Sequence, residues 1–201
     1  MTAALNESDP PAYKAELPAL ARLLGVTLAV SVLRAFGSVR GAGLASDSEL
    51  RALGVSDAKL RNFRNAVAVG ALAVAAPVLG RLILDPSDVA AYFAAQLALV
   101  DVEEFWLVGL DSRHRIVGQT MVSRGSVSGV EITARSVFRT LLRMDASAAI
   151  VVHQHPSGDP TASASDLVVT KKLTAAGKVV GITLLDHLVV VPGGAWRSCK
   201  P

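Results

Sequence analysis

Apolar residues recur with a helical period over residues 20–76, and glycines interrupt the pattern. Apolar positions three and four residues apart predict amphipathic helices, and glycine favours the breaks between them. The breaks fall at Gly37, from Gly41 to Gly43, and at Gly54. A Ser-x-x-Glu pattern in SDSEL, residues 46–50, predicts a helix start of the capping-box type. We therefore expect a small module of short helices over residues 1–84.

The pattern changes to alternating strands and helices over residues 85–201. The segment LDPSDVAAYFAAQLALV predicts a helix entered through Pro86 and Ser87. Two apolar runs separated by the polar DSRHR predict a β-hairpin over residues 103–123. Helical spacing then alternates with two short β-branched runs, which gives the order β-β-α-β-α-β. This order predicts a second domain of the α+β or α/β class.

Composition limits the class of protein. A chain of 201 residues that is 51% hydrophobic can bury one core, or one core and a smaller module. The longest uncharged stretch, residues 66–80, is shorter than the ~20 residues that a membrane-spanning helix needs. The start of the sequence lacks the blocks of a signal peptide, and the single cysteine, Cys199, excludes a disulfide framework. We expect a cytoplasmic protein with no membrane partner.

Charge is distributed unevenly between the two parts. The net charge is +3, and residues 1–84 hold nine Lys and Arg against six Asp and Glu, whereas residues 85–201 hold eleven of each. A nucleic-acid-binding surface needs clustered cations, and only Lys59, Arg61 and Arg64 approach a cluster. The solvated flank of a helix is the favoured interpretation of these three residues.

The segment HQHPSGDPTASASD, residues 153–166, carries the main candidate chemistry. The apolar run before it predicts a buried strand that ends at His153. Residues two apart in a strand point to one face, so His153 and His155 would lie side by side. With Asp166 they offer two imidazole nitrogens and one carboxylate, a ligand set that zinc accepts with one position left for water.

Each part of this motif also has a purely structural interpretation. Ser163 and Asp166 match a capping box at a helix start, and His153 could be a buried histidine at the end of a strand. Taken one at a time, the structural interpretations are favoured. Taken together, two histidines beside a rigid turn have no packing benefit, and we favour a hydrolytic metal site.

The motif resembles that of the RadC-like branch of the JAB/MPN family, the JAMM metalloproteases. The resemblance extends to EEFWLVGLDSRHRIVG, SRGSV, DLVVTKKL and GITLLDHLVVV, in family order. It implies an MPN domain, with a mixed β-sheet flanked by helices, over residues 85–201. It implies that His153, His155 and Asp166 bind Zn²⁺, with Ser163 as a polar catalytic helper. The family's Glu-x-Phe pattern matches Glu103 as the general base.

Amide hydrolysis at zinc requires such a base on chemical grounds as well. Residues 85–201 contain the glutamates Glu103, Glu104 and Glu131. Neighbouring strand residues face opposite sides, so at most one of Glu103 and Glu104 can point at the metal. By spacing alone either residue is an exposed charge at a strand start, and the resemblance favours Glu103.

Three further residues near these motifs receive weaker assignments. Glu131 would line the approach to the site or begin the next helix. His187 would support the site or be a buried structural residue, with Asp186 able to orient it. His114 would be a solvated residue of the hairpin loop.

The helical module resembles the second half of a helix-hairpin-helix unit in LRALGVSDAKLRNFRNAVAVG. A hairpin that binds DNA presents Gly-hydrophobic-Gly, whose amides approach a phosphate closely. Here Ser56 and Asp57 follow Gly54 and Val55, so the second glycine is missing and an anion is added. The module is a degenerate hairpin for which we expect weak or absent DNA binding.

Two functions remain open from the sequence. The first is a zinc metallopeptidase that cleaves a peptide or isopeptide bond in a peptide or protein substrate. The second is an accessory or scaffold protein of DNA repair with a non-catalytic MPN fold, as the family's traditional label suggests. The intact ligand set favours the first. The sequence leaves the substrate and the oligomeric state open.

Overall fold

The computed structural model describes residues 5–74, 79–125 and 132–200. Contacts divide the chain into two compact units, Met1–Ala75 and Ala76–Pro201. None of the described helices has the length and apolar character that a bilayer-spanning segment requires.

The division lies earlier in the chain than the expected boundary after Leu84. The amide of Gly80 donates to the carbonyl of Ile116 at 2.8 Å, and Leu82 forms a β-bridge with Arg115. Ile83 is buried in the core of the second unit. The segment before the expected boundary is therefore held by the hairpin of the second unit.

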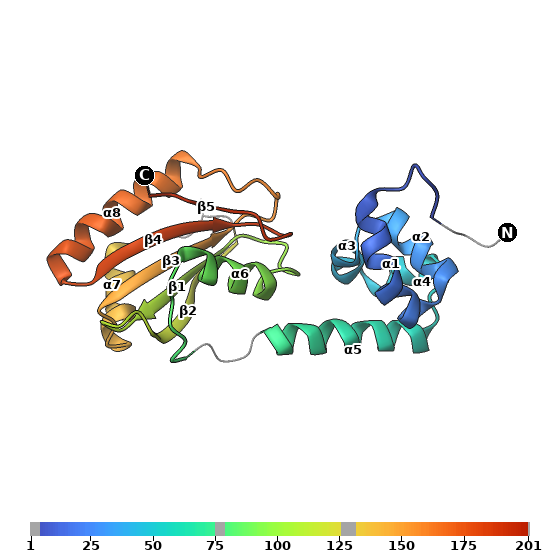
Figure 1. Cartoon of the computed structure of the whole chain (residues 1–201), viewed down its shortest axis with the longest axis horizontal. Coiled ribbons are helices and arrows are strands. Elements are labelled where there is room, and N and C mark those ends of the chain that lie inside the picture. Colours follow the sequence, from blue (N-terminus) through green and yellow to red (C-terminus); the bar gives the residue numbers. More distant parts are fainter. Residues whose placement is uncertain (1–4, 75–78, 126–131, 201) are drawn as a thin grey trace. The chain divides into compact units, whose positions relative to one another are not determined.

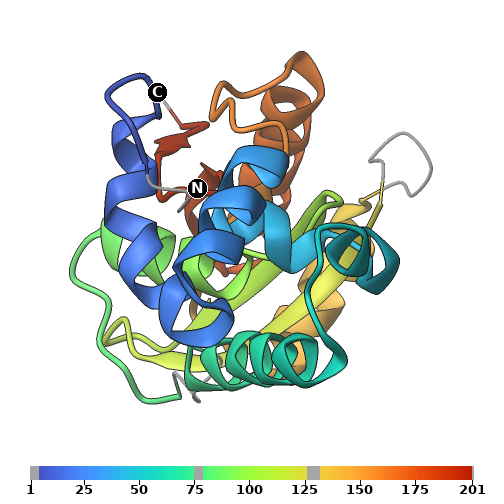
Figure 2. The same cartoon turned by 90° about the vertical axis from the view of Figure 1, so that its right-hand side faces the viewer.

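The first unit is a bundle of helices around one apolar core (Figures 1 and 2). The helices are α1 (Pro11–Leu24), α2 (Val26–Phe36), α3 (Val39–Leu44), α4 (Asp47–Ala52) and α5 (Asp57–Val74). Ser46 and Glu49 form the expected capping box at the start of α4. Gly41 is required because a Cβ atom there would collide with the carbonyl oxygen of Phe36. The prediction of a helical module is confirmed.

The turn between α4 and α5 uses Gly54 in the left-handed region, with φ of +89°. Cations near this turn have intramolecular partners. Lys59 Nζ donates to the carbonyl of Leu24 at 2.6 Å, and Arg64 donates to the carbonyl of Gly43 at 2.7 Å. Asp57 Oδ1 lies 2.8 Å from Nε of Arg51.

The second unit is built on a five-stranded mixed sheet in the order β2-β1-β3-β4-β5 (Figure 1). The strands are β1 (Glu104–Leu110), β2 (Ile116–Arg124), β3 (Ala148–Gln154), β4 (Thr183–Val190) and β5 (Trp196–Ser198). All neighbours pair antiparallel except β3 and β4, which are parallel. The hairpin of β1 and β2 and the strands β3 and β4 are as predicted. The short strand β5 was not predicted.

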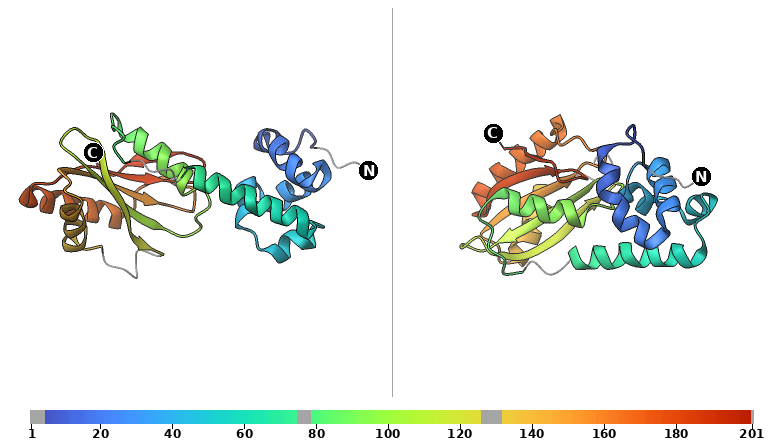
Figure 3. Two further views of the ribbon diagram at one scale, coloured as in Figure 1. Left: turned by 90° about the horizontal axis from the view of Figure 1, so that it is seen from below. Right: turned by 45° about the vertical axis from the view of Figure 1, so that its right-hand side comes forward.

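Helices cover both faces of the sheet (Figure 3). They are α6 (Pro86–Gln96), α7 (Ala134–Arg143) and α8 (Ala164–Val180). Apolar residues of α6 pack on one face, and those of α7 and α8 pack on the other. Parallel neighbours need a crossover connection, and α8 forms the one between β3 and β4. The predicted mixed sheet flanked by helices is confirmed.

Candidate metal centre

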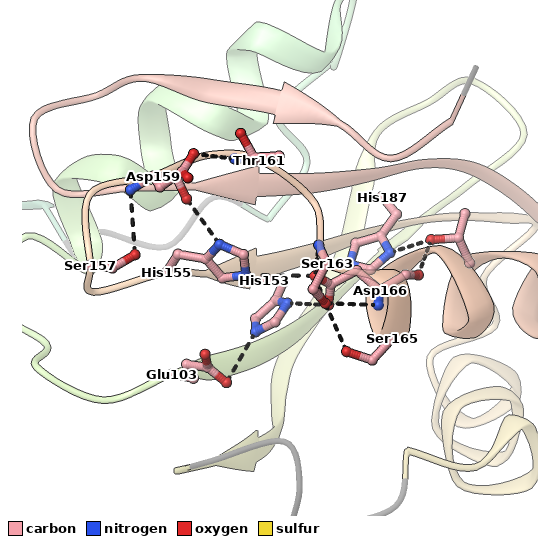
Figure 4. Close-up of polar contacts among 11 residues, drawn as sticks. Glu103, His153, His155, Ser157, Asp159, Thr161, Ser163, Ser165, Asp166 and His187 are labelled. Atoms are coloured by element: carbon pink, nitrogen blue, oxygen red, sulfur yellow. Dashed lines mark hydrogen bonds and ion pairs between the residues drawn. The ribbon is translucent and has the colours of Figure 1, made fainter.

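A cluster of polar side chains lies where the end of β3, the residue before β1 and the first turn of α8 meet (Figure 4). Pairing between β1 and β3 places Phe105 opposite His153 and Glu104 opposite Gln154. Because side chains alternate between faces, His153 and Phe105 share the face covered by α8, and Gln154 points to the other face.

The two adjacent glutamates have different surroundings. Glu103 Oε2 lies 3.7 Å from Nε2 of His153, and its side chain is 36% exposed. Glu104 is buried, accepts a hydrogen bond from the indole nitrogen of Trp106 at 2.8 Å, and lies 3.3 Å from Nε of Arg124. Glu103 therefore lies at the cluster, whereas Glu104 contacts Trp106 and Arg124 outside it.

Both predicted ligand histidines use Nδ1 for a hydrogen bond with an oxygen. His153 Nδ1 lies 2.8 Å from Oδ1 of Asp166, and His155 Nδ1 lies 3.0 Å from the carbonyl oxygen of Asp159. An ionised carboxylate and a carbonyl only accept, so each ring donates from Nδ1 and, when neutral, has its lone pair on Nε2. The two rings lie side by side with centroids 4.6 Å apart, as the His-x-His spacing predicted.

Asp166 occupies the first turn of α8 and is part of its cap. The Ser163 amide and hydroxyl donate to Oδ2 of Asp166 at 2.7 and 2.6 Å, and the Asp166 amide donates to the Ser163 hydroxyl at 3.2 Å. The structural interpretation of these two residues, a capping box, therefore holds. It does not remove Asp166 from the cluster, because Oδ1 contacts His153 and Oδ2 lies 3.6 Å from Nε2 of His155. The Ser163 hydroxyl lies 2.7 Å from that of Ser165.

Asp166 and His155 shift each other's pKa values so that the charged form of each is favoured. Burial alone would raise the pKa of Asp166, but hydrogen bonds from His153 and Ser163, together with the nearby His155 imidazole, hold this pKa well below the usual range. The nearby Asp166 carboxylate raises the pKa of His155, against the effect of burial and with a further contribution from the Asp159 carbonyl. Asp166 is therefore ionised at neutral pH although it is buried.

Comparison with known proteins identifies the domain that carries this cluster. The family model of the RadC-like JAB domain matches residues 83–200. The chain belongs to the RadC-like JAB family. A UPF0758 protein of Desulforudis audaxviator is 34% identical over 167 residues, which is 82% of this chain and 73% of the relative. A UPF0758 protein of Chloroflexus aggregans is 34% identical over 187 residues, 89% of this chain and 82% of the relative. These names state no reaction and no substrate.

The donor atoms of this RadC-like JAB domain fit a divalent metal ion. One group, Glu103, His153 and His155, and a second, His153, Asp166 and His187, each bring three ligand atoms within 4.8 Å of one another. At bond lengths of about 2.1 Å, two ligands of one tetrahedral zinc are about 3.4 Å apart. The separation of 3.6 Å between His155 and Asp166 is close to this value, and Glu103 lies 3.7 Å from His153 beside these donors. Within the described residues, the three predicted ligands are divided between the two groups.

His187 joins the cluster from β4 by a contact that differs from the expected one. Asp186 Oδ1 accepts from the backbone amide of His187 at 2.7 Å and from the hydroxyl of Ser198. The imidazole ring is instead held by Thr170, whose hydroxyl lies 2.6 Å from its Nδ1. Thr170 follows Asp166 by four residues and therefore lies on the same side of α8. This spacing indicates that Thr170 faces the same side as Asp166, but it does not indicate a contact with His187.

Two further residues considered from the sequence, His114 and Glu131, are not seen in the described cluster. His114 is exposed in the loop between β1 and β2. This loop follows β1, whereas Glu103 precedes the strand, so the two residues lie at different ends of β1. Glu131 lies outside the described residues.

Proposed function

We propose that the second unit is a zinc-dependent hydrolase that cleaves a peptide or isopeptide bond. The observation that carries the proposal is the Glu103, His153 and His155 group, in which a partly exposed carboxylate stands beside two imidazoles at the edge of a buried site. We assign His153, His155 and Asp166 as zinc ligands and Glu103 as the general base. Zinc held there would supply a Lewis acid that polarises the substrate carbonyl and lowers the pKa of water.

Burial supports this division of roles between the two carboxylates. The Asp166 side chain is 4% exposed and the Glu103 side chain is 36% exposed. A charged carboxylate without solvent requires a cation or hydrogen-bond donors, which suits a ligand. A carboxylate open to solvent can take a proton from the attacking water and deliver it to the leaving nitrogen.

The residues around Glu103 and the histidines give this chemistry a fixed geometry. The hydrogen bonds from Nδ1 of His153 and His155 fix the tautomer that has Nε2 available, the usual device for imidazole ligands. Ser163 holds Asp166 through its amide and hydroxyl. In this proposal Ser163 acts by positioning Asp166, because its single hydroxyl proton is donated to that carboxylate.

Elemental analysis of the purified full chain tests the metal part of the proposal. We expect about one zinc per chain, and strong depletion of zinc in the His155→Ala variant. Cleavage of a peptide library, monitored by mass spectrometry, tests the reaction. The absence of zinc together with an unchanged melting temperature after zinc addition contradicts the proposal.

We further infer that the first unit binds duplex DNA weakly or not at all. Lys59 and Arg64, two of the three clustered cations, donate to backbone carbonyls within the unit. Arg51, near the α4–α5 turn, is paired with Asp57. Cations engaged in such contacts contribute little to phosphate binding, which favours a hydrolase over a DNA-bound scaffold.

A further inference from the structure

His187 is completely buried at 0% exposure, yet it carries a polar atom without a hydrogen-bond partner. Its Nε2 atom has no such partner among the described residues. Leaving a buried polar atom without a partner destabilises the fold, whereas an apolar side chain of similar size would avoid this cost. Packing alone therefore does not account for an imidazole at this position.

The hydrogen bonds of Thr170 determine which nitrogen of His187 carries the proton. The Thr170 hydroxyl donates to the carbonyl of Asp166 at 2.6 Å and lies 2.6 Å from Nδ1 of His187. A hydroxyl has one proton, and the carbonyl can only accept. Both contacts are favourable only if His187 donates from Nδ1 to the hydroxyl oxygen. The lone pair of His187 is therefore on Nε2.

This arrangement repeats that of the two predicted ligand histidines. His153, His155 and His187 each hold Nδ1 against an oxygen, and each neutral ring has its lone pair on Nε2. The His187 ring is close to parallel with that of His153, with centroids 6.3 Å apart and an interplanar angle of 25°.

His187 belongs to a group of side chains that could hold a metal ion. A ligand atom of His187 lies within 4.8 Å of ligand atoms of both His153 and Asp166. A buried imidazole acceptor and a buried carboxylate near one another are both stabilised by a shared cation. Two imidazoles and one carboxylate are a common donor set for zinc.

We propose that His187 is an additional metal ligand of this domain, binding through Nε2 from the buried side of the site. The inference rests on the proposed metal site and extends its ligand set to His153, His155, Asp166 and His187. Zinc can expand from four to five ligands, so four protein ligands still leave room for a water beside Glu103. Thr170 is a positioning residue that fixes the tautomer of His187.

Nitrogen NMR of the full chain with isotopically labelled histidines tests the proposal without any substitution. On titration with zinc, we expect the Nε2 resonances of His153, His155 and His187 to shift together, while those of His114 stay in place. A response of His153 and His155 without His187 overturns the inference and leaves the proposed function standing. If zinc shifts the resonances of none of the four histidines, both the inference and the proposed metal site are overturned.

Competition with a chelator measures how much His187 contributes to the zinc affinity of the protein. Loss of a supporting hydrogen bond to a ligand weakens metal binding by about 10- to 100-fold, and we expect Thr170→Val to fall in this range. His187→Gln should exceed about 100-fold because it removes the ligand itself. His114→Gln is the matched control and should not change the affinity. Equal zinc affinity of His187→Gln and wild type, in protein whose circular dichroism shows it to be folded, overturns the inference.

Discussion

Nδ1 of His153 donates to Oδ1 of Asp166 across 2.8 Å, and this contact joins the end of β3 to the first turn of α8. The same carboxylate accepts two hydrogen bonds from Ser163 through its other oxygen. Asp166 is therefore an element of the fold and of the candidate metal centre at once. Substitutions at this site need controls that separate the two roles.

The first prediction concerns the general base. Glu103→Gln should retain zinc and fold but lose about 10²- to 10⁴-fold in turnover, the usual contribution of general-base catalysis. Glu104→Gln is the matched control, since Glu104 contacts Trp106 and Arg124 instead of the cluster. Turnover and zinc content of both variants are measured together. Loss of zinc in Glu103→Gln would show that Glu103 is a ligand.

The second prediction separates the role of Asp166 as a metal ligand from its role in the N-terminal cap of α8. Asp166→Asn keeps the shape of the side chain but removes its charge, so zinc affinity should fall sharply. Ser163→Ala removes the hydroxyl of the cap and should lower the free energy of unfolding by about 0.5–2 kcal/mol, with a smaller loss of zinc affinity. Denaturant unfolding and chelator competition provide the two readouts. Equal loss of zinc affinity in both variants would mean that the cap, and not the charge, holds the metal.

The third prediction concerns the pH dependence of the metal-free protein. Burial lowers the pKa of His187 from 6.5 to about 4, so the folded protein binds fewer protons than the unfolded chain between these values. The free energy of unfolding should therefore rise with pH from about 4 to about 6.5. Asp166, with its lowered pKa, adds a loss of stability only at more acidic pH, and the raised pKa of His155 acts in the opposite direction, above pH 6.5.

Urea unfolding in the presence of a chelator, at several pH values in this window, measures the effect. His187→Gln removes the titrating imidazole and should flatten the slope between about pH 4 and 6.5. An unchanged slope in the variant would assign the pH dependence to another group.

The fourth prediction concerns the single cysteine. Cys199 is 6% exposed, and burial, aided by the charges of Asp166 and Asp186, raises the pKa of its thiol to about 12. Its thiolate fraction should be roughly three to four orders of magnitude below that of an exposed cysteine with a pKa of about 8.5. Alkylation at neutral pH should be slow in the folded protein and fast in denaturant. Equal rates in the two conditions would show that the C-terminal segment opens readily.

The fifth prediction concerns the helical unit. Duplex DNA affinity of the full chain at physiological salt should be no better than the nonspecific range of about 10⁻⁴ to 10⁻⁶ M. Fluorescence anisotropy at two salt concentrations measures both affinity and salt dependence. Tight binding with a steep salt dependence would mean that the degenerate hairpin still contacts phosphates.

Local sequence patterns predicted the parts of this protein that depend on neighbours along the chain. The His-x-His spacing placed two imidazoles on one side of a strand end, and the Ser-x-x-Asp pattern placed a cap at the start of α8. The two apolar runs around DSRHR predicted the β1–β2 hairpin. Strand alternation and helix capping are properties of a few consecutive residues, so one sequence is enough to recognise them.

Contacts between distant segments were decided only by the tertiary structure. The sequence left Glu103 and Glu104 equivalent on spacing, and the pairing of β1 with β3 placed Glu103 beside His153. The partner of His187 is Thr170, and this contact depends on how α8 packs over β4. A β-strand specifies which residues share a face but not which strand or helix lies against that face. The packing of separate elements therefore selected the base candidate and brought a third imidazole to the site.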